Sequence, residues 1–320
     1  MSEQYNPGNQ YEWYRRVAKG NLPPMIITVA PTGGVQGKEL NPNHPETAEE
    51  QAEQVYDAYK AGASMVHVHA RMPENPSRMS PRTADYLAIN GMIREKCPDI
   101  IIGNTTGGGA QLNEEELLAS TDANPEVCSL NMGPIGGRLV LKKRLPPLTG
   151  RPEDIMIDNE ILFMSIRENE RFAKAMLEKG IKPEMEVYHP GQWWLVDNLV
   201  QQDLIKPPYL IQFVMGMQLG MHSTPRALMN MIETATVPGV FCACSVGPWQ
   251  TSMLTFAILM GLDVRVGMED NIYYAKGELC KDNAQMVERL VRIAKELGRE
   301  IATPKQARQM LGISEKPTQY

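Results

Sequence analysis

Short apolar runs rich in β-branched residues alternate along the chain with longer segments in which apolar residues recur at helical spacing. The runs that we interpret as strands are 25–31, 64–70, 99–109, 126–133, 184–189, 209–216, 240–247 and 263–269. The segments that we interpret as helices are 47–61, 82–96, 113–119, 158–179, 192–202, 225–234, 250–260 and 283–298. The pattern therefore predicts a series of eight strand–helix units.

Strands that are apolar on both faces and separated by helices indicate a parallel sheet, and eight such strands close into a (β/α)8 TIM barrel. A doubly wound open sheet is the alternative, but no Gly-x-Gly-x-x-Gly motif follows the first strand. The proline-rich pieces are short and lie between elements, so residues 1–320 are expected to form one α/β domain. Residues 1–22 would be an N-terminal extension, and 303–312 a C-terminal extra helix.

Composition narrows the class of protein. Hydrophobic residues make up 42% of the chain and charged residues 22%, which is typical of a globular protein and excludes disorder and coiled coil. The net charge of -6 gives no basic surface for nucleic acid or an anionic membrane. The longest strongly apolar stretch, 253–262, is about half of the ~20 residues that a membrane span needs. With no apolar signal segment at the N-terminus and an odd number of cysteines, a cytoplasmic protein is expected.

The active site of a barrel is built at the carboxyl ends of its strands, where this chain places a pair of histidines. His67 and His69 end the second strand on one face, because side chains alternate along a strand. Glu269 ends the eighth strand, about two strand spacings or roughly 10 Å away. Two imidazoles and one carboxylate with an open fourth position are a typical catalytic zinc site. The alternatives are core histidines and, for Glu269, an exposed turn or helix N-cap.

Two charged residues are expected inside the barrel. Arg265 lies on the eighth strand, and Glu186 lies on the fifth strand across the lumen. Because a buried charge is costly unless it is paired, we expect an ion pair between Arg265 and Glu186. A guanidinium held in this way would also be positioned near the metal.

The ends of the first, third and fourth strands carry small and polar residues. Small residues let backbone amides approach a ligand carboxylate, although a glycine run is also consistent with a tight turn. The candidates for substrate binding are Thr32, Val35, Thr105, Thr106, Gly107, Gly108, Ser129 and Asn131.

Several strings spread over the chain carry a resemblance to a known family. They are TVAPTGG, HVHAR followed by PSRMSPRTADY, NTTGGG, PEVCSLNMG, KPEMEVY, QFVMG and VRVGMEDNIYYAKGELCKDNAQMVERLVRIAKELGREIATPKQAR. Over about residues 25–311, the chain resembles the β-keto acid cleavage enzymes. The resemblance implies a zinc-dependent barrel, usually a homo-oligomer, here a dimer or tetramer. Such an enzyme exchanges a β-keto acid and acetyl-CoA for acetoacetate and a new acyl-CoA.

The resemblance also implies roles for individual residues. It matches His67, His69 and Glu269 to the zinc ligands. It matches Asp270 and Arg265 to the proton-abstracting pair, with Glu186 holding the arginine. The residues that it places at the substrate's carboxylate and keto end are Thr105, Gly107, Gly108 and Ser129.

One position departs from the family member that cleaves 3-keto-5-aminohexanoate. Where that enzyme has a glutamate for the substrate's amino group, this chain has Val35. The sequence therefore does not identify the physiological β-keto acid. Two other functions stay open as well. One is a zinc hydrolase of the amidohydrolase type, which carries its His-x-His on the first strand rather than the second. The other is a metal-stabilised protein that binds keto acids without turnover.

Overall fold

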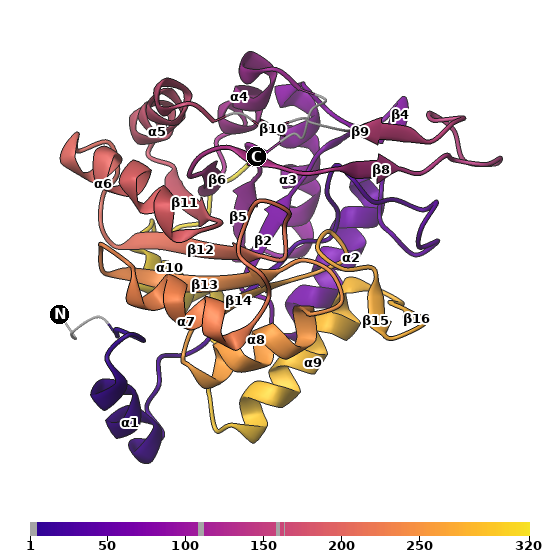
Figure 1. Cartoon of the computed structure of the whole chain (residues 1–320). Helices are drawn as coiled ribbons and strands as arrows, with labels where there is room; N and C mark the ends of the chain where they lie inside the picture. Colours follow the sequence, from indigo (N-terminus) through magenta and orange to yellow (C-terminus); the bar gives the residue numbers. More distant parts are fainter. Residues whose placement is uncertain (1–4, 108–111, 158–160, 163) are drawn as a thin grey trace.

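A computed structural model describes residues 5–107, 112–157, 161–162 and 164–320, and it contains a closed barrel of parallel strands (Figure 1). Around the barrel the strands follow the order β1-β14-β13-β12-β11-β6-β5-β2, so β14, the last barrel strand along the chain, closes beside β1. The strands are β1 Ile27–Val29, β2 Met65–Val68, β5 Ile101–Asn104, β6 Val127–Asn131, β11 Lys182–Val187, β12 Tyr209–Met215, β13 Gly239–Ser245 and β14 Asp263–Val266. The predicted (β/α)8 barrel is confirmed, and the open sheet is excluded.

Helices surround this barrel (Figure 1). They are α2 Ala48–Ala61, α3 Thr83–Lys96, α4 Glu114–Asp122, α5 Ile166–Lys179, α6 Trp193–Gln201, α7 Pro225–Glu233, α8 Gln250–Leu259 and α9 Asn283–Glu296. Their apolar faces pack against the outer side chains of the strands and form the main core. No helix in the described part of the chain is both long and apolar enough to cross a bilayer.

The helix predicted at 158–179 starts later than the pattern suggested. It begins at Ile166, because Ser165 and Glu168 form a capping box that satisfies the backbone N–H groups at its first turn. Before it, β10 Ile161–Leu162 pairs antiparallel with β7 Ile135–Gly136. Residues 158–160 and 163 lie outside the described part of the chain.

The two ends of the barrel differ. At the amino ends of the strands, α10 Pro304–Leu311 packs Ala307 and Leu311 against strand residues such as Met65 and Ile101. This is the predicted C-terminal helix, and it covers that end with an apolar plug. The N-terminal helix α1 Gln10–Lys19 lies at the edge of the molecule beside α8 and buries none of its residues (Figure 1). The opposite end of the barrel is where the strands present polar side chains.

Three hairpins that the sequence pattern did not indicate lie beyond the carboxyl ends of the strands. They are β3 Arg71–Met72 with β4 Asn75–Met79, β8 Leu139–Leu141 with β9 Ile155–Ile157, and β15 Tyr273–Ala275 with β16 Glu278–Leu279. Most residues of these short strands are exposed or half-buried, so they form no continuous apolar run that the sequence could show. β4, β8 and β9 lie together on one side of the molecule (Figure 1).

Candidate active site

The strand ends bring the three predicted metal ligands together. His67 and His69 come from β2 and the residue that follows it, and Glu269 comes from the turn after β14. Nε2 of His67 lies 3.1 Å from Nε2 of His69, and Nε2 of His69 lies 3.1 Å from Oε1 of Glu269. Atoms bound tetrahedrally at about 2.0 to 2.1 Å from one zinc ion lie about 3.3 Å apart. One candidate ligand atom from each side chain lies within 4.8 Å of the other two, so the arrangement fits a single ion.

The protonation states of these side chains also suit a metal. Burial lowers the pKa of His67 well below its ordinary value, so its ring is neutral and has a free lone pair. Burial would raise the pKa of Glu269, but the charge of Arg265 and the hydrogen bond with His69 hold it well below its ordinary range. Oε2 of Glu269 is buried and has no hydrogen-bond partner among the described residues. A bound cation would give this orphaned oxygen a partner.

The turn that carries Glu269 packs tightly against β1. A Cβ on Gly267 would lie 2.0 Å from the carbonyl oxygen of Ala30, so only glycine allows this approach. The backbone N–H of Glu269 donates to the same oxygen at 3.2 Å. The register of β1 beside β14 therefore determines where the Glu269 side chain starts.

Arg265 holds the second carboxylate of this turn. Its Nε and Nη2 donate to the two oxygens of Asp270 at 3.1 and 3.0 Å, which is a bidentate pair. Its Nη2 also lies 2.5 Å from Oε1 of Glu269, and the predicted pair with Glu186 is present at 3.4 Å. Burial raises the pKa of Asp270 above its ordinary value, although Arg265 opposes the rise. A buried, oriented carboxylate of raised pKa beside a metal site is suited to accept a proton from carbon.

Strand neighbours hold Glu186 in turn. Its Oε1 accepts from Nε2 of Gln212 at 2.9 Å, and its Oε2 accepts from the hydroxyl of Tyr188 at 3.1 Å. The same hydroxyl also contacts Oδ1 of Asn131 at 2.7 Å. Burial would lower the pKa of Arg265, but the surrounding carboxylates raise it well above its ordinary value. The guanidinium is thus permanently charged and fixed on three sides.

The predicted substrate residues of the third and fourth strands lie close together. The N–H of Thr106 donates to Oγ of Ser129 at 3.0 Å, and the hydroxyl of Thr106 donates to the carbonyl of Ser129. The hydroxyl of Thr105 accepts from the N–H of Gly107 at 2.9 Å and forms a tight turn. Gly108 lies outside the described residues. The binding role of this group stays a prediction.

The remaining predicted substrate residues are less closely grouped. Asn131 faces Tyr188 at the end of β6, as described above. Oγ1 of Thr32 lies 3.3 Å from Nδ1 of the buried His44. Val35 lies further along the same loop and is 38% exposed. Its contact with substrate is untested.

Sequence reasoning missed a third acidic residue in the barrel interior. Glu184 is fully buried, and neither of its carboxyl oxygens has a hydrogen-bond partner among the described residues. Its Oε2 lies 3.9 Å from Nδ1 of His67. Burial and the nearby Glu186 raise the pKa of Glu184 to about 8. The sequence did contain a signal for Glu184: it lies two residues before Glu186 on the same strand, so the two side chains share a face.

Comparison with known proteins places these residues in a family. The family model for beta-keto acid cleavage enzymes matches residues 24–313. The chain belongs to the β-keto acid cleavage enzyme family. The resemblance predicted from the sequence is therefore confirmed, and it includes both strands that supply the candidate metal ligands.

Curated relatives of this β-keto acid cleavage enzyme match it over nearly their whole length. It is 38% identical to the 3-keto-5-aminohexanoate cleavage enzyme of Fusobacterium nucleatum subsp. nucleatum, over 90% of this chain and 98% of that protein. It is 29% identical to the 3-dehydrocarnitine:acetyl-CoA trimethylamine transferase of Rhizobium meliloti, over 91% of this chain and 97% of that protein. The apo structure of ObcA has a TM-score of 0.65 and 19% identity, over 85% of this chain and 66% of that one. That likeness concerns the fold alone.

Proposed function

We propose that this chain is a zinc-dependent acyltransferase that converts a β-keto acid and acetyl-CoA into acetoacetate and a new acyl-CoA. The observation that carries the proposal is the geometry of one turn. Glu269 of this turn meets His67 and His69, and the next residue, Asp270, is clamped by Arg265. Family membership and relatives whose names include acetyl-CoA transferases support the same reaction class.

The residues divide the work of the first step. A zinc ion held by His67, His69 and Glu269 would polarise the keto oxygen of the substrate and so make its C2 protons more acidic. Asp270 accepts one of these protons. Arg265 orients the carboxylate of Asp270 and keeps it from turning away, and the C2 carbanion is then free to attack the thioester carbonyl of acetyl-CoA.

The remaining steps need no covalent bond to the protein. Attack by C2 forms a carbon–carbon bond and expels the CoA thiolate. The thiolate then adds to the original C3 carbonyl, the C2–C3 bond breaks, and Asp270 returns its proton to C2. Acetoacetate leaves with C1 and C2 of the keto acid and the acetyl group, and the other carbons leave as acyl-CoA. Cys242 and Cys244 are not required as nucleophiles, and burial raises the pKa of both thiols well above the ordinary value.

A panel of β-keto acids tests the proposed function. We expect the purified chain to form acetoacetate and a matching acyl-CoA in equal amounts, only when both the keto acid and acetyl-CoA are present. Chromatography of the CoA esters measures this directly. A hydrolase would release free acids without a new CoA ester, and a binding protein would show no turnover. Either result would contradict the proposal.

We propose that the substrate has an uncharged tail, because the resemblance places Val35 where the 3-keto-5-aminohexanoate enzyme has a glutamate. An ammonium group against an isopropyl side chain loses part of its water without gaining a charged partner, which weakens binding of a charged tail. We expect a higher kcat/KM for 3-oxopentanoate or 3-oxohexanoate than for 3-keto-5-aminohexanoate. Val35→Glu should improve the amino substrate.

Val35→Gln is the matched control for this specificity prediction, because it has the size of glutamate without the charge. We expect it to leave the amino substrate poor. If the unaltered protein prefers the amino substrate by about tenfold, Val35 does not select the tail and another acid binds the ammonium group.

We also propose that the chain acts as a homo-oligomer, a dimer or tetramer, in the cytoplasm. The resemblance to the family supports the homo-oligomer. The five cysteines, which are all unpaired and buried, support a reducing compartment.

A further inference from the structure

The candidate metal site is assembled from two strands that are not neighbours. β1 lies between β2, which supplies the histidines, and β14, which precedes Glu269. The distance across the site therefore depends on β1 and on the loop that follows it, residues 30–47. A residue that fixes this loop to both sides would also fix the relative position of the ligands.

Arg71 fixes the loop to the histidine side. It lies two residues after His69, and its Nη2 donates to the backbone carbonyls of Gly33 and Gln36, both at 2.5 Å. Its Nη1 donates to the carbonyl of Pro76 at 2.8 Å. One planar guanidinium thus joins the continuation of β2, the β3–β4 hairpin and the loop after β1.

The loop in turn touches Glu269 at two points. Nε2 of Gln36 donates to the backbone carbonyl of Glu269 at 3.2 Å. Gly33 packs on its side chain so closely that a Cβ there would lie 2.6 Å from Cγ of Glu269. These are the same two residues whose carbonyls Arg71 holds.

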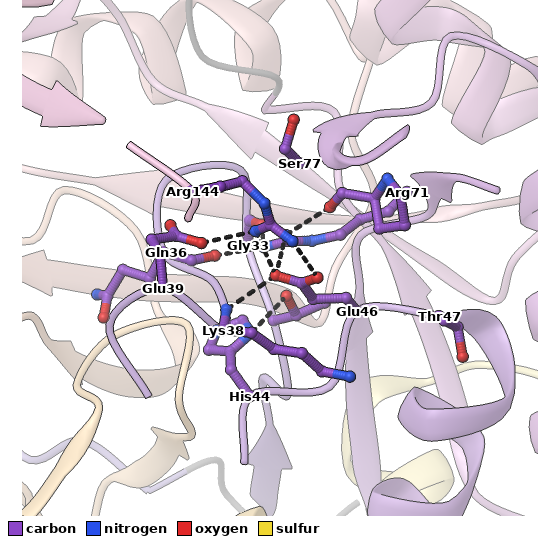
Figure 2. Close-up of polar contacts among 12 residues, drawn as sticks. Gly33, Gln36, Lys38, Glu39, His44, Glu46, Thr47, Arg71, Ser77 and Arg144 are labelled. Carbon is purple, nitrogen blue, oxygen red and sulfur yellow. Dashed lines mark hydrogen bonds and ion pairs between the residues drawn. The ribbon is translucent and has the colours of Figure 1, made fainter. Parts of the chain in front are cut away.

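A buried cluster of charges braces this arrangement from behind, and Figure 2 shows Arg71, Glu46, Arg144 and the loop residues gathered in one place. Glu46 accepts from both Nη1 and Nη2 of Arg144 at 2.7 Å and lies 3.6 Å from Nη1 of Arg71. Glu39 pairs with Arg144 at 2.6 Å and with Arg151 at 2.9 Å. The cluster ties the far half of the loop to the segment that joins β8 and β9.

Arg71 and Glu46 stay charged at neutral pH. Burial lowers the pKa of Arg71 to about 10, with Glu46 opposing the fall. Burial would raise the pKa of Glu46, but the hydrogen bonds from Arg144 bring it below its ordinary value. Ionised partners in this position form stronger hydrogen bonds than neutral ones and hold the loop more firmly.

We propose that Arg71 is a positioning residue for the metal site. By holding the carbonyls of Gly33 and Gln36, it fixes the loop after β1, and that loop holds Glu269 where it meets His67 and His69. The inference rests on the proposed zinc site, but it concerns residues that are not ligands. Arg71 touches neither the ion nor the reacting atoms in this account.

Zinc affinity of the full-length protein, measured by competition with a chelator, tests the inference. Residues that orient metal ligands from outside typically change affinity by about 10- to 100-fold when replaced. We expect a loss of that size for Arg71→Met and for Arg71→Lys, because an ammonium group has no planar fork to hold these carbonyls. Arg82→Met is the matched control. Arg82 lies in the same region, but it is exposed, and among the described residues its side chain pairs with Glu74 and Asp85 alone.

Two further variants separate positioning from stability. Gly33→Ala would push the side chain of Glu269 aside, and Gln36→Ala would remove the hydrogen bond to the backbone carbonyl of Glu269. Neither variant changes a charged residue of the cluster. We expect each to weaken zinc binding with little change in the melting temperature of the zinc-free protein. They also decide the question if Arg71→Met fails to fold.

The outcomes distinguish the two proposals. If the unaltered protein binds zinc, and Arg71→Lys, Gly33→Ala and Gln36→Ala bind it equally well, the positioning role is contradicted and the zinc site stands. If these variants have a lower melting temperature but unchanged zinc affinity, the positioning role is likewise contradicted and the zinc site stands. If the unaltered protein has no zinc affinity, the zinc site itself is contradicted, and this inference with it.

Discussion

Asp270→Asn should keep the fold and the zinc but lower kcat by about 10²- to 10⁴-fold, the usual contribution of a general base. An amide of the same shape still occupies the space beside Arg265 but accepts no proton from C2. Steady-state rates of acetoacetate formation, together with zinc content and melting temperature, measure the three properties separately.

Asp57→Asn is the control for this variant, because Asp57 is an exposed aspartate on α2 that pairs with Lys60. It should have ordinary kinetics. If Asp270→Asn turned over near the rate of the unaltered protein, the base would lie elsewhere, and Glu184 would be the next carboxylate to replace.

His67→Ala should reduce the zinc content from about one ion per chain to a small fraction, and activity should fall with it. Loss of one of three protein ligands leaves too few donors for a stable tetrahedral site. Metal analysis after dialysis measures the content, and zinc titration shows whether activity returns.

The matched control is His222→Ala, which removes an exposed histidine in the segment between β12 and α7. It should retain zinc and activity. A His67→Ala protein with full metal content would show that His69 and Glu269 bind the ion with other partners, and the proposed ligand set would be wrong.

Most of the fold could be predicted from local sequence patterns. The barrel strands are buried on both faces and so appear as apolar runs, and each unit contains a helix, so the number and order of units could be predicted. The start of α5 could not be predicted from hydrophobic spacing, because a capping box at Ser165 sets it. The motif itself is visible in the sequence, and attention to it would have corrected the boundary.

The candidate site shows the same division between local and distant signals. Alternation along one strand predicts that His67 and His69 share a face, and the order of strands in a barrel brings Glu269 to them. Arg71 and its cluster gave no such signal. Glu46 and Arg144 are 98 positions apart and meet only because the loop after β1 and the segment that joins β8 and β9 fold together. Contacts of this kind depend on tertiary structure that no local pattern encodes.

The fate of the acetyl group tests the central claim most directly. Acetyl-CoA labelled with carbon-13 in both acetyl carbons is incubated with an unlabelled β-keto acid, and the products are analysed by NMR. The account predicts the label at C3 and C4 of acetoacetate and an unlabelled new acyl-CoA. Label in free acetate, or a new acyl-CoA that carries the label, would contradict it.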